Sequence, residues 1–207
     1  ALQWQPPLMD IAKRHGWRLY MSTKSTCPIP SVTVYRSNGE LAPDCDAWRE
    51  SVLAQIGRLR PDLVIAANRN DYHILGGYDI DSADNQRLWH DGLMSSLSRL
   101  KSAAGEVLLL GDSPHWTQDI PSCLTAHPDD MSACGDRRSA AISSLRTAND
   151  RAAAAEVGVS FRTTAHLVCP YDPCPVIIDD LLLIGDYQHL TPPFTLSVAR
   201  GLERLLP

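Results

Sequence analysis

Leu63-Val-Ile-Ala-Ala67 is a continuous apolar run that lies between a Pro61-Asp62 turn and the polar segment 68–71. A short run without polar alternation predicts a strand that is buried on both faces, as the strands of parallel sheets are. Glu106-Val-Leu-Leu-Leu110 has the same character further along the chain. The two runs therefore predict a fold built on a parallel sheet.

Segments with helical periodicity alternate with these runs. The pattern predicts helices over 6–15, 47–59, 85–103, 137–156 and 193–206, and further strands over 17–21, 159–161, 176–178 and 181–184. Such alternation implies a three-layer α/β/α fold around a mostly parallel, flavodoxin-like sheet. Because no linker or repeat interrupts it, we expect one domain over residues 1–207. Ligands of such sheets bind beyond the carboxyl ends of the strands, which directs attention to residues 68–71, 111–116 and 186–189.

The composition is that of an ordinary globular protein. Apolar residues make up 44% of the chain and charged residues 21%, and the net charge is −5. No basic surface favours nucleic acid, and no uncharged apolar run approaches the roughly 18 residues of a membrane-spanning helix. The chain also opens without the pattern of a signal peptide. We therefore expect a globular domain that binds no nucleic acid and needs no cofactor.

The six cysteines form three pairs that are close in sequence: Cys27 with Cys45, Cys123 with Cys134, and Cys169 with Cys174. An even number in local pairs favours three disulfides and an oxidising compartment. The Cys169–Cys174 spacing is also compatible with half of a zinc site, although no pair has the C-x-x-C spacing that zinc ribbons favour. Buried free thiols are a further alternative. Disulfides are the preferred interpretation, with no metal.

Asp186 and His189 lie in the segment Gly185-Asp-Tyr-Gln-His-Leu-Thr191, between a predicted strand and the last helix. The spacing lets a carboxylate accept a hydrogen bond from one imidazole nitrogen while the other nitrogen deprotonates a serine. The same residues also suit an ordinary helix start, where an aspartate favours the helix dipole. The position after a buried C-terminal strand favours a catalytic pair.

Gly111-Asp-Ser113 follows an apolar strand, and Ser113 could serve as the nucleophile of that pair. A serine on such a turn lies near backbone N–H groups that can bind an oxyanion. Asp, Ser and Pro are equally common at plain strand-ending turns. Asn68, after the first buried strand, is a candidate oxyanion donor with the same alternative of an ordinary polar turn.

Seven short segments stand in a fixed order along the chain: Ile11-Ala-Lys-Arg-His-Gly-Trp17, Thr23-Lys-Ser-Thr-Cys-Pro28, Cys45-Asp-Ala-Trp-Arg-Glu50, Leu59-Arg-Pro-Asp-Leu-Val-Ile65, Asp119-Ile-Pro-Ser-Cys-Leu124, residues 169–175 and residues 186–191. Through these segments the chain as a whole resembles the SGNH domains that are fused to the C-terminus of bacterial membrane acyltransferase-3 proteins.

The resemblance places the nucleophile outside the chain. In that family a Gly-Asp-Ser-His-Ala block immediately precedes the helix that opens this sequence, and residues 1–4 look like the tail of the block. Gly111-Asp-Ser-Pro114 then falls at a mid-domain strand end. The expectation is an SGNH domain that lacks its first strand and its catalytic serine, with Ser113 as the less favoured nucleophile.

The resemblance also implies a function. The intact protein would transfer an acyl group, commonly acetyl, onto a hydroxyl of a bacterial surface glycan through an acyl-serine intermediate. The acyl donor would come from an upstream integral-membrane domain, and this domain would lie on the periplasmic face, tethered to the inner membrane. The alternatives are a carbohydrate or lipid esterase that uses the same residues, and a degenerate domain that only binds glycan.

Overall fold

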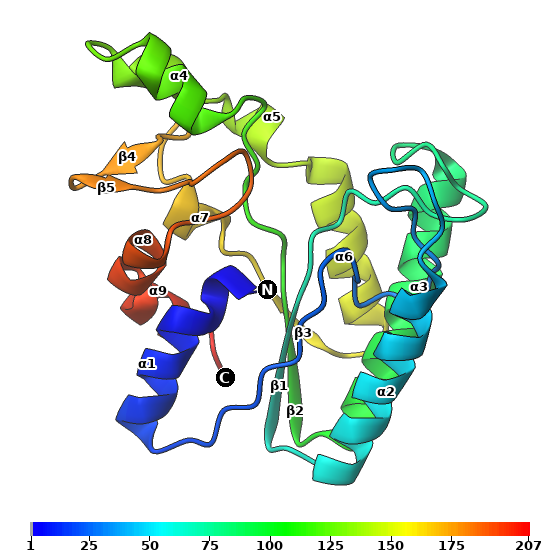
Figure 1. Cartoon of the computed structure of the whole chain (residues 1–207). Helices are drawn as coiled ribbons and strands as arrows, with labels where there is room; N and C mark the ends of the chain where they lie inside the picture. The colour runs from blue at the N-terminus through cyan, green and yellow to red at the C-terminus, as the bar shows by residue number, and fades with distance from the viewer. Residues whose placement is uncertain (1) are drawn as a thin grey trace. The chain divides into compact units, whose positions relative to one another are not determined.

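The structure, a computed structural model, describes residues 2–207 (Figure 1). The chain divides into two compact units. The first is formed by the segment up to Met21 together with Ser113–Ser144 and Thr163–Pro207. The second is formed by Ser22–Asp112 and Leu145–Arg162. Each unit is described separately below.

The second unit contains a parallel three-stranded sheet. Its strands are β1 (Leu63–Ala67), β2 (Glu106–Leu110) and β3 (Ser160–Arg162), in the order β1-β2-β3. Both pairings are parallel, and Leu108 lies between Ile65 and Ser160. The predicted α/β class with a parallel sheet is confirmed.

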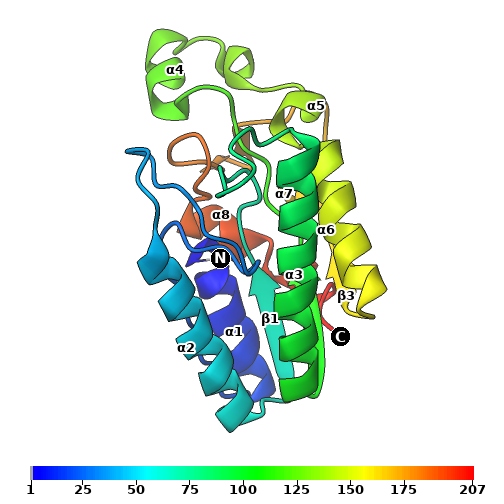
Figure 2. The ribbon, with the colours of Figure 1, turned by 90° about the vertical axis from the view of Figure 1, so that its right-hand side faces the viewer.

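Three helices pack near this sheet: α2 (Pro43–Leu59), α3 (Ala83–Ala103) and α6 (Ser144–Glu156). The helices α3 and α6 run side by side over one face of the sheet (Figures 1 and 2). Their apolar side chains share one core with β2 and β3, which includes Leu93, Leu97, Leu100, Val107, Leu109, Ala153, Ala154 and Phe161. Ser82 caps α3 because its side chain accepts a hydrogen bond from the Asn85 backbone N–H.

A disulfide and a buried arginine organise the loop before α2. Cys27 is bonded to Cys45, and the core beside them contains Val34 and Ile74. Arg49 is only 6% exposed, and its guanidinium donates to the carbonyl oxygens of Pro28 and Val32 at 3.1 and 3.0 Å. These bonds satisfy carbonyl groups that the irregular loop would otherwise leave buried without partners.

The first unit is mostly helical. Its elements are η1 (Leu2–Trp4), α1 (Gln5–His15), α4 (Ile120–Ala126), η2 (Met131–Cys134), α5 (Arg138–Ala141), α7 (Ala165–Val168), β4 (Ile177–Ile178), β5 (Leu181–Leu182), α8 (Pro192–Ser197) and α9 (Ala199–Glu203). The helix α1 packs against α8 and α9. It ends at Gly16, which has a positive φ of 67° and closes the last turn as expected for a glycine stop.

Several predicted elements differ from the structure. The helix expected from residue 47 begins at Pro43, and Leu59, expected inward, is 46% exposed. The helix expected over 137–156 is divided into α5 and α6, and the final helix is divided into α8 and α9. The strands expected at 176–178 and 181–184 form the antiparallel hairpin β4–β5 and do not join the parallel sheet.

Residues 17–21, expected to form a strand, have no ladder partner among the described residues. Trp17 and Tyr20 are 47% and 61% exposed. A strand is defined by the neighbour that receives its backbone hydrogen bonds, so an extended segment without one is not a strand. β1 is likewise less buried than expected, because only Ala66 of its five residues is fully buried. None of the helices in the described part of the chain is long and apolar enough to cross a membrane.

Candidate active site

Asp186 and His189 meet in a tight loop of the first unit. The His189 ring nitrogen Nδ1 lies 2.6 Å from Asp186 Oδ2. The other carboxylate oxygen, Oδ1, accepts the backbone N–H groups of Gln188 and His189 at 2.7 and 2.8 Å. The carboxylate therefore both shapes the loop and orients the imidazole, whose side chain is 67% exposed.

The base of this loop is closed by backbone bonds. Gly185 N–H donates to His189 O at 2.8 Å, and Ile184 and Leu190 form an antiparallel bridge. Thr191 then caps α8, because its hydroxyl accepts from Phe194 N–H. The buried bridge residue Ile184 on one side and a capped helix start on the other thus hold the Asp-x-x-His segment.

The hydrogen bonds of Asp186 determine its charge. Partial burial alone would raise the pKa of this carboxyl, but the bonds from the His189 side chain and from the backbone N–H groups of Gln188 and His189 outweigh that effect. The pKa of Asp186 is therefore held below its usual value. An ionised Asp186 at neutral pH holds the proton on Nδ1, which leaves Nε2 as the nitrogen that can act as a base.

A second segment of the same unit supports the loop from outside. Trp116 N–H donates to Tyr187 O at 2.7 Å, and Ile120 N–H donates to Asp186 O at 3.2 Å. Trp116 is 3% exposed, and its indole Nε1 has no hydrogen-bond partner among residues 2–207. These backbone bonds fix the carbonyl groups of Asp186 and Tyr187. Sequence reasoning did not identify this role of residues 116–120, because backbone bonding leaves no pattern of side chains.

Ser113 is 6% exposed, and its hydroxyl oxygen accepts a hydrogen bond from Gln3 Nε2 at 2.7 Å. A nucleophile must be reached by an acyl donor, and a buried hydroxyl that accepts from an amide is poorly suited to that task. Ser113 is thus a buried hydrogen-bond acceptor within the first unit.

The polar segment after β1 belongs to the second unit. Asn68 Oδ1 accepts the backbone N–H of Ile29 at 3.1 Å, so its amide nitrogen is the end left to donate to another group. Asn70 is 8% exposed and donates from Nδ2 to Asp150 at 2.8 Å. Of the two, Asn68 is the one that suits an oxyanion donor.

Asp150 is a buried carboxyl that sequence reasoning missed. It is 2% exposed, and besides Asn70 it accepts from the Trp89 indole Nε1 at 2.8 Å. Burial raises its pKa to about 6, although the bonds from Asn70 and Trp89 oppose the rise. A signal was present in the sequence, since Asp150 lies three and four residues before Ala153 and Ala154 on the apolar stripe of its helix.

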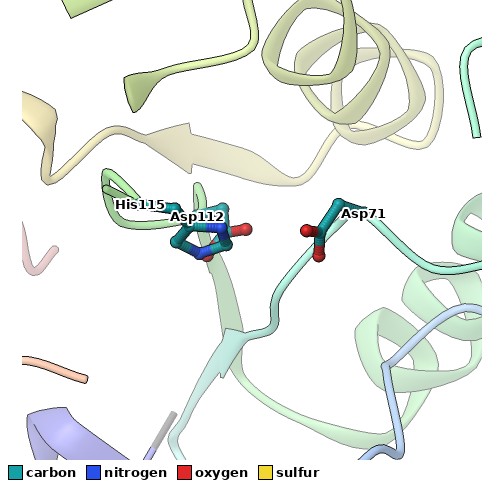
Figure 3. A group of neighbouring side chains, drawn as sticks. All are labelled: Asp71, Asp112 and His115. Carbon is teal, nitrogen blue, oxygen red and sulfur yellow. The ribbon is translucent and has the colours of Figure 1, made fainter. Parts of the chain in front are cut away.

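Two further carboxylates lie where strands of the second unit end. Asp71 follows β1 and Asp112 follows β2, with carboxylate oxygens within 4.8 Å of each other (Figure 3). Asp71 is paired with Arg69, and Asp112 accepts the backbone N–H of Asn70 at 3.0 Å. Both carboxylates therefore help to shape the 68–71 segment. His115, which Figure 3 also labels, belongs to the first unit.

The six cysteines form the three predicted disulfides, Cys27–Cys45, Cys123–Cys134 and Cys169–Cys174. None of the six is free, which removes the thiolates that a zinc site would have needed. Three disulfides in one chain of this size favour an extracytoplasmic compartment.

Comparisons with known proteins identify the family of the chain. A family model described as "SGNH domain (fused to AT3 domains)" matches residues 1–204. A solved structure, the periplasmic domain of a lipopolysaccharide acetyltransferase from Salmonella ser. Paratyphi A, has the same fold with a TM-score of 0.68 at 13% identity. The match covers 97% of this chain and 77% of the Salmonella chain. No curated protein sequence matches this chain.

Proposed function

Because the chain belongs to the family of SGNH domains that are fused to AT3 domains, we propose that it is the extracytoplasmic part of a glycan O-acyltransferase. The acyl group is most commonly acetyl in such proteins, and the acceptor is a hydroxyl of a bacterial surface glycan. The single observation that carries the proposal is the Asp186–His189 pair, with its 2.6 Å hydrogen bond and exposed imidazole, in a chain of this family. The activity of the Salmonella protein with the same fold supports it.

The nucleophile of the reaction is a serine that precedes Ala1. Its position agrees with the burial of Ser113. It also agrees with the absence, among the described residues, of a ladder partner for the outer edge of β1, which an added strand would supply. The chain by itself is then inactive.

The reaction proceeds in two steps. His189 Nε2 removes the serine proton while the serine oxygen attacks the acyl carbonyl carbon, and the protonated imidazole then returns the proton to the departing donor group. In the second step Nε2 deprotonates a sugar hydroxyl, whose oxygen attacks the acyl-serine. The sugar ester leaves, and the serine oxygen recovers the proton. Asp186 stays ionised throughout and stabilises the imidazolium.

The donor and the location follow from the fusion partner. An upstream integral-membrane domain delivers the acyl group and tethers this domain to the inner membrane on the periplasmic side. Asn68, in the second unit, stays the oxyanion donor that the sequence predicts. An esterase would use the same groups with water as the acceptor, so the two activities differ in where the acyl group ends.

The test uses the full-length protein, with acyl transfer to glycan and release of free carboxylic acid measured together. We expect transfer to exceed release, His189→Ala to abolish both, and Ser113→Ala to retain activity within a few-fold. Complete loss in Ser113→Ala would make Ser113 the nucleophile. Activity that survives His189→Ala, or glycan binding without any turnover by the wild-type protein, would contradict the proposal.

A further inference from the structure

The Gln3 side chain links two parts of the first unit that both hold the Asp186–His189 loop. Its Nε2 donates to Ser113 Oγ at 2.7 Å, and its Oε1 accepts the backbone N–H of Leu190 at 3.1 Å. A backbone N–H can only donate, so the amide orientation is determined by chemistry as well as by geometry. The nitrogen and the oxygen of the Gln3 carboxamide are therefore both hydrogen-bonded.

The two partners of Gln3 lie at the two supports of the loop. Leu190 directly follows His189, is 5% exposed, and forms the bridge with Ile184 that closes the loop. Ser113 is 6% exposed and begins the segment whose residues Trp116 and Ile120 donate to the loop carbonyls. The bonds of Gln3 thus set the position of η1 relative to the imidazole of His189.

The position of Leu190 matters because His189 directly precedes it. On the proposed function, His189 Nε2 moves the proton in both steps, so the hydrogen bond from Leu190 N–H to Gln3 helps to fix the base. A misplacement of about 1 Å between reacting groups costs about 100-fold in rate.

We propose that Gln3 and Ser113 are positioning residues of the acyl-transfer site, which hold the Asp186–His189 loop in place through Leu190 and through the segment that begins at Ser113. The inference rests on the proposed function. It assigns Ser113 a task that needs its hydroxyl but not its nucleophilicity, and it assigns Gln3 a task for which a merely apolar residue of equal size does not suffice.

The experiment uses the full-length protein and measures kcat and KM for the glycan acceptor, together with the rate at which a fluorophosphonate labels the serine. Gln3→Met keeps the length of the side chain and removes both hydrogen bonds. We expect it to lower kcat and the labelling rate by about 10- to 100-fold, with KM within about two-fold of wild type. The matched control is Gln55→Ala, on the exposed surface of α2, which should leave every value unchanged.

Ser113 provides an independent variant should Gln3→Met fold poorly. We expect Ser113→Ala to lower kcat by about three-fold and Ser113→Thr, which retains the hydroxyl, to restore it. If the two residues act through one bridge, the double variant Gln3→Met/Ser113→Ala should be no slower than Gln3→Met alone.

Wild-type kcat and labelling rate in Gln3→Met, or effects of the two variants that simply multiply, would overturn the inference. A loss confined to KM or to thermal stability would do the same, since it would indicate a structural role. His189→Ala in the same assay distinguishes a failure of the proposed function from a failure of the positioning role. If His189→Ala is inactive and Gln3→Met is normal, the proposed function stands and the positioning role fails.

Discussion

Asp186 combines two tasks that are separate in many active sites. One of its oxygens shapes the backbone of the loop through two N–H groups, and the other orients the His189 ring. Since the carboxylate accepts all three bonds, its ionised form is the one that the loop stabilises. The carboxylate of the proposed catalytic pair thus also gives its own loop its conformation.

Asp186→Asn tests this double role. An amide oxygen can replace Oδ1 at the backbone N–H groups, but the amide nitrogen then faces the ring and favours the wrong tautomer of His189. We expect kcat to fall by about 10³- to 10⁴-fold, by analogy with serine hydrolases, while KM changes little. Circular dichroism should show an unchanged fold. A decrease of less than ten-fold in kcat would argue against the orienting role of Asp186.

The raised pKa of the buried Asp150 carboxyl predicts an unusual pH dependence of the free energy of unfolding. Its pKa is raised by burial from 3.8 to about 6 in the folded state, so the folded protein holds this proton more tightly than the unfolded chain does. The stabilisation is complete below pH 4 and is lost as the pH rises through 6, an effect of about 3 kcal/mol. Stability at pH 7 is lower by that amount than it would be with a neutral group.

Asp150→Asn measures this contribution, because it removes the titration while other groups cancel in the difference. Chemical unfolding of both proteins between pH 4 and 7 should show that the wild type loses about 3 kcal/mol relative to the variant as the pH rises. A difference that is constant with pH, or that grows in favour of the wild type, would refute a raised pKa.

At the scale of elements, two glycines of the second unit differ in how closely neighbouring atoms pack around them. A Cβ at Gly105, between α3 and β2, would lie 2.7 Å from the backbone oxygen of Asp62. The backbone there cannot yield, because Gly105 N–H and Glu106 N–H are bonded to the carbonyls of Pro61 and Asp62 at the start of β1. Gly57, in the interior of α2, has open space where a Cβ would be.

Substitutions of Gly105 and Gly57 give a matched test of the register between β1 and β2. We expect Gly105→Ala to destabilise the protein by about 1–3 kcal/mol through overpacking. Gly57→Ala should stabilise it by about 0.5–1 kcal/mol, because alanine favours a helix interior. Equilibrium unfolding in urea measures both. Equal effects of the same sign would show that the β1–β2 connection is looser than described.

At the scale of the whole molecule, the question is whether the serine is contributed by the chain before Ala1. We expect a fluorophosphonate to label a protein that extends upstream of Ala1 and to leave residues 1–207 alone unlabelled and without turnover. The extended protein should also show slower hydrogen exchange in Leu63–Ala67, because an added strand would protect the outer edge of β1. Labelling of the 1–207 chain, or its absence from the extended protein, would contradict an upstream nucleophile.

The sequence by itself determined the local features. Continuous apolar runs predicted the parallel strands β1 and β2, since each strand is a single contiguous segment whose apolar composition can be read directly. Local cysteine pairs predicted the three disulfides, and the spacing of Asp186 and His189 predicted their hydrogen bond, because three residues in a turn bring two side chains within reach.

The tertiary structure decided what depends on residues far apart in sequence. The division of the last two strands into a separate hairpin, the bonds from Trp116 and Ile120 to the Asp186 loop, and the burial of Asp150 between Asn70 and Trp89 all join distant segments. So does the link from Gln3 to Ser113 and Leu190. Such contacts arise from the path of the chain in space, and neither periodicity nor spacing records which distant group will complete a hydrogen bond.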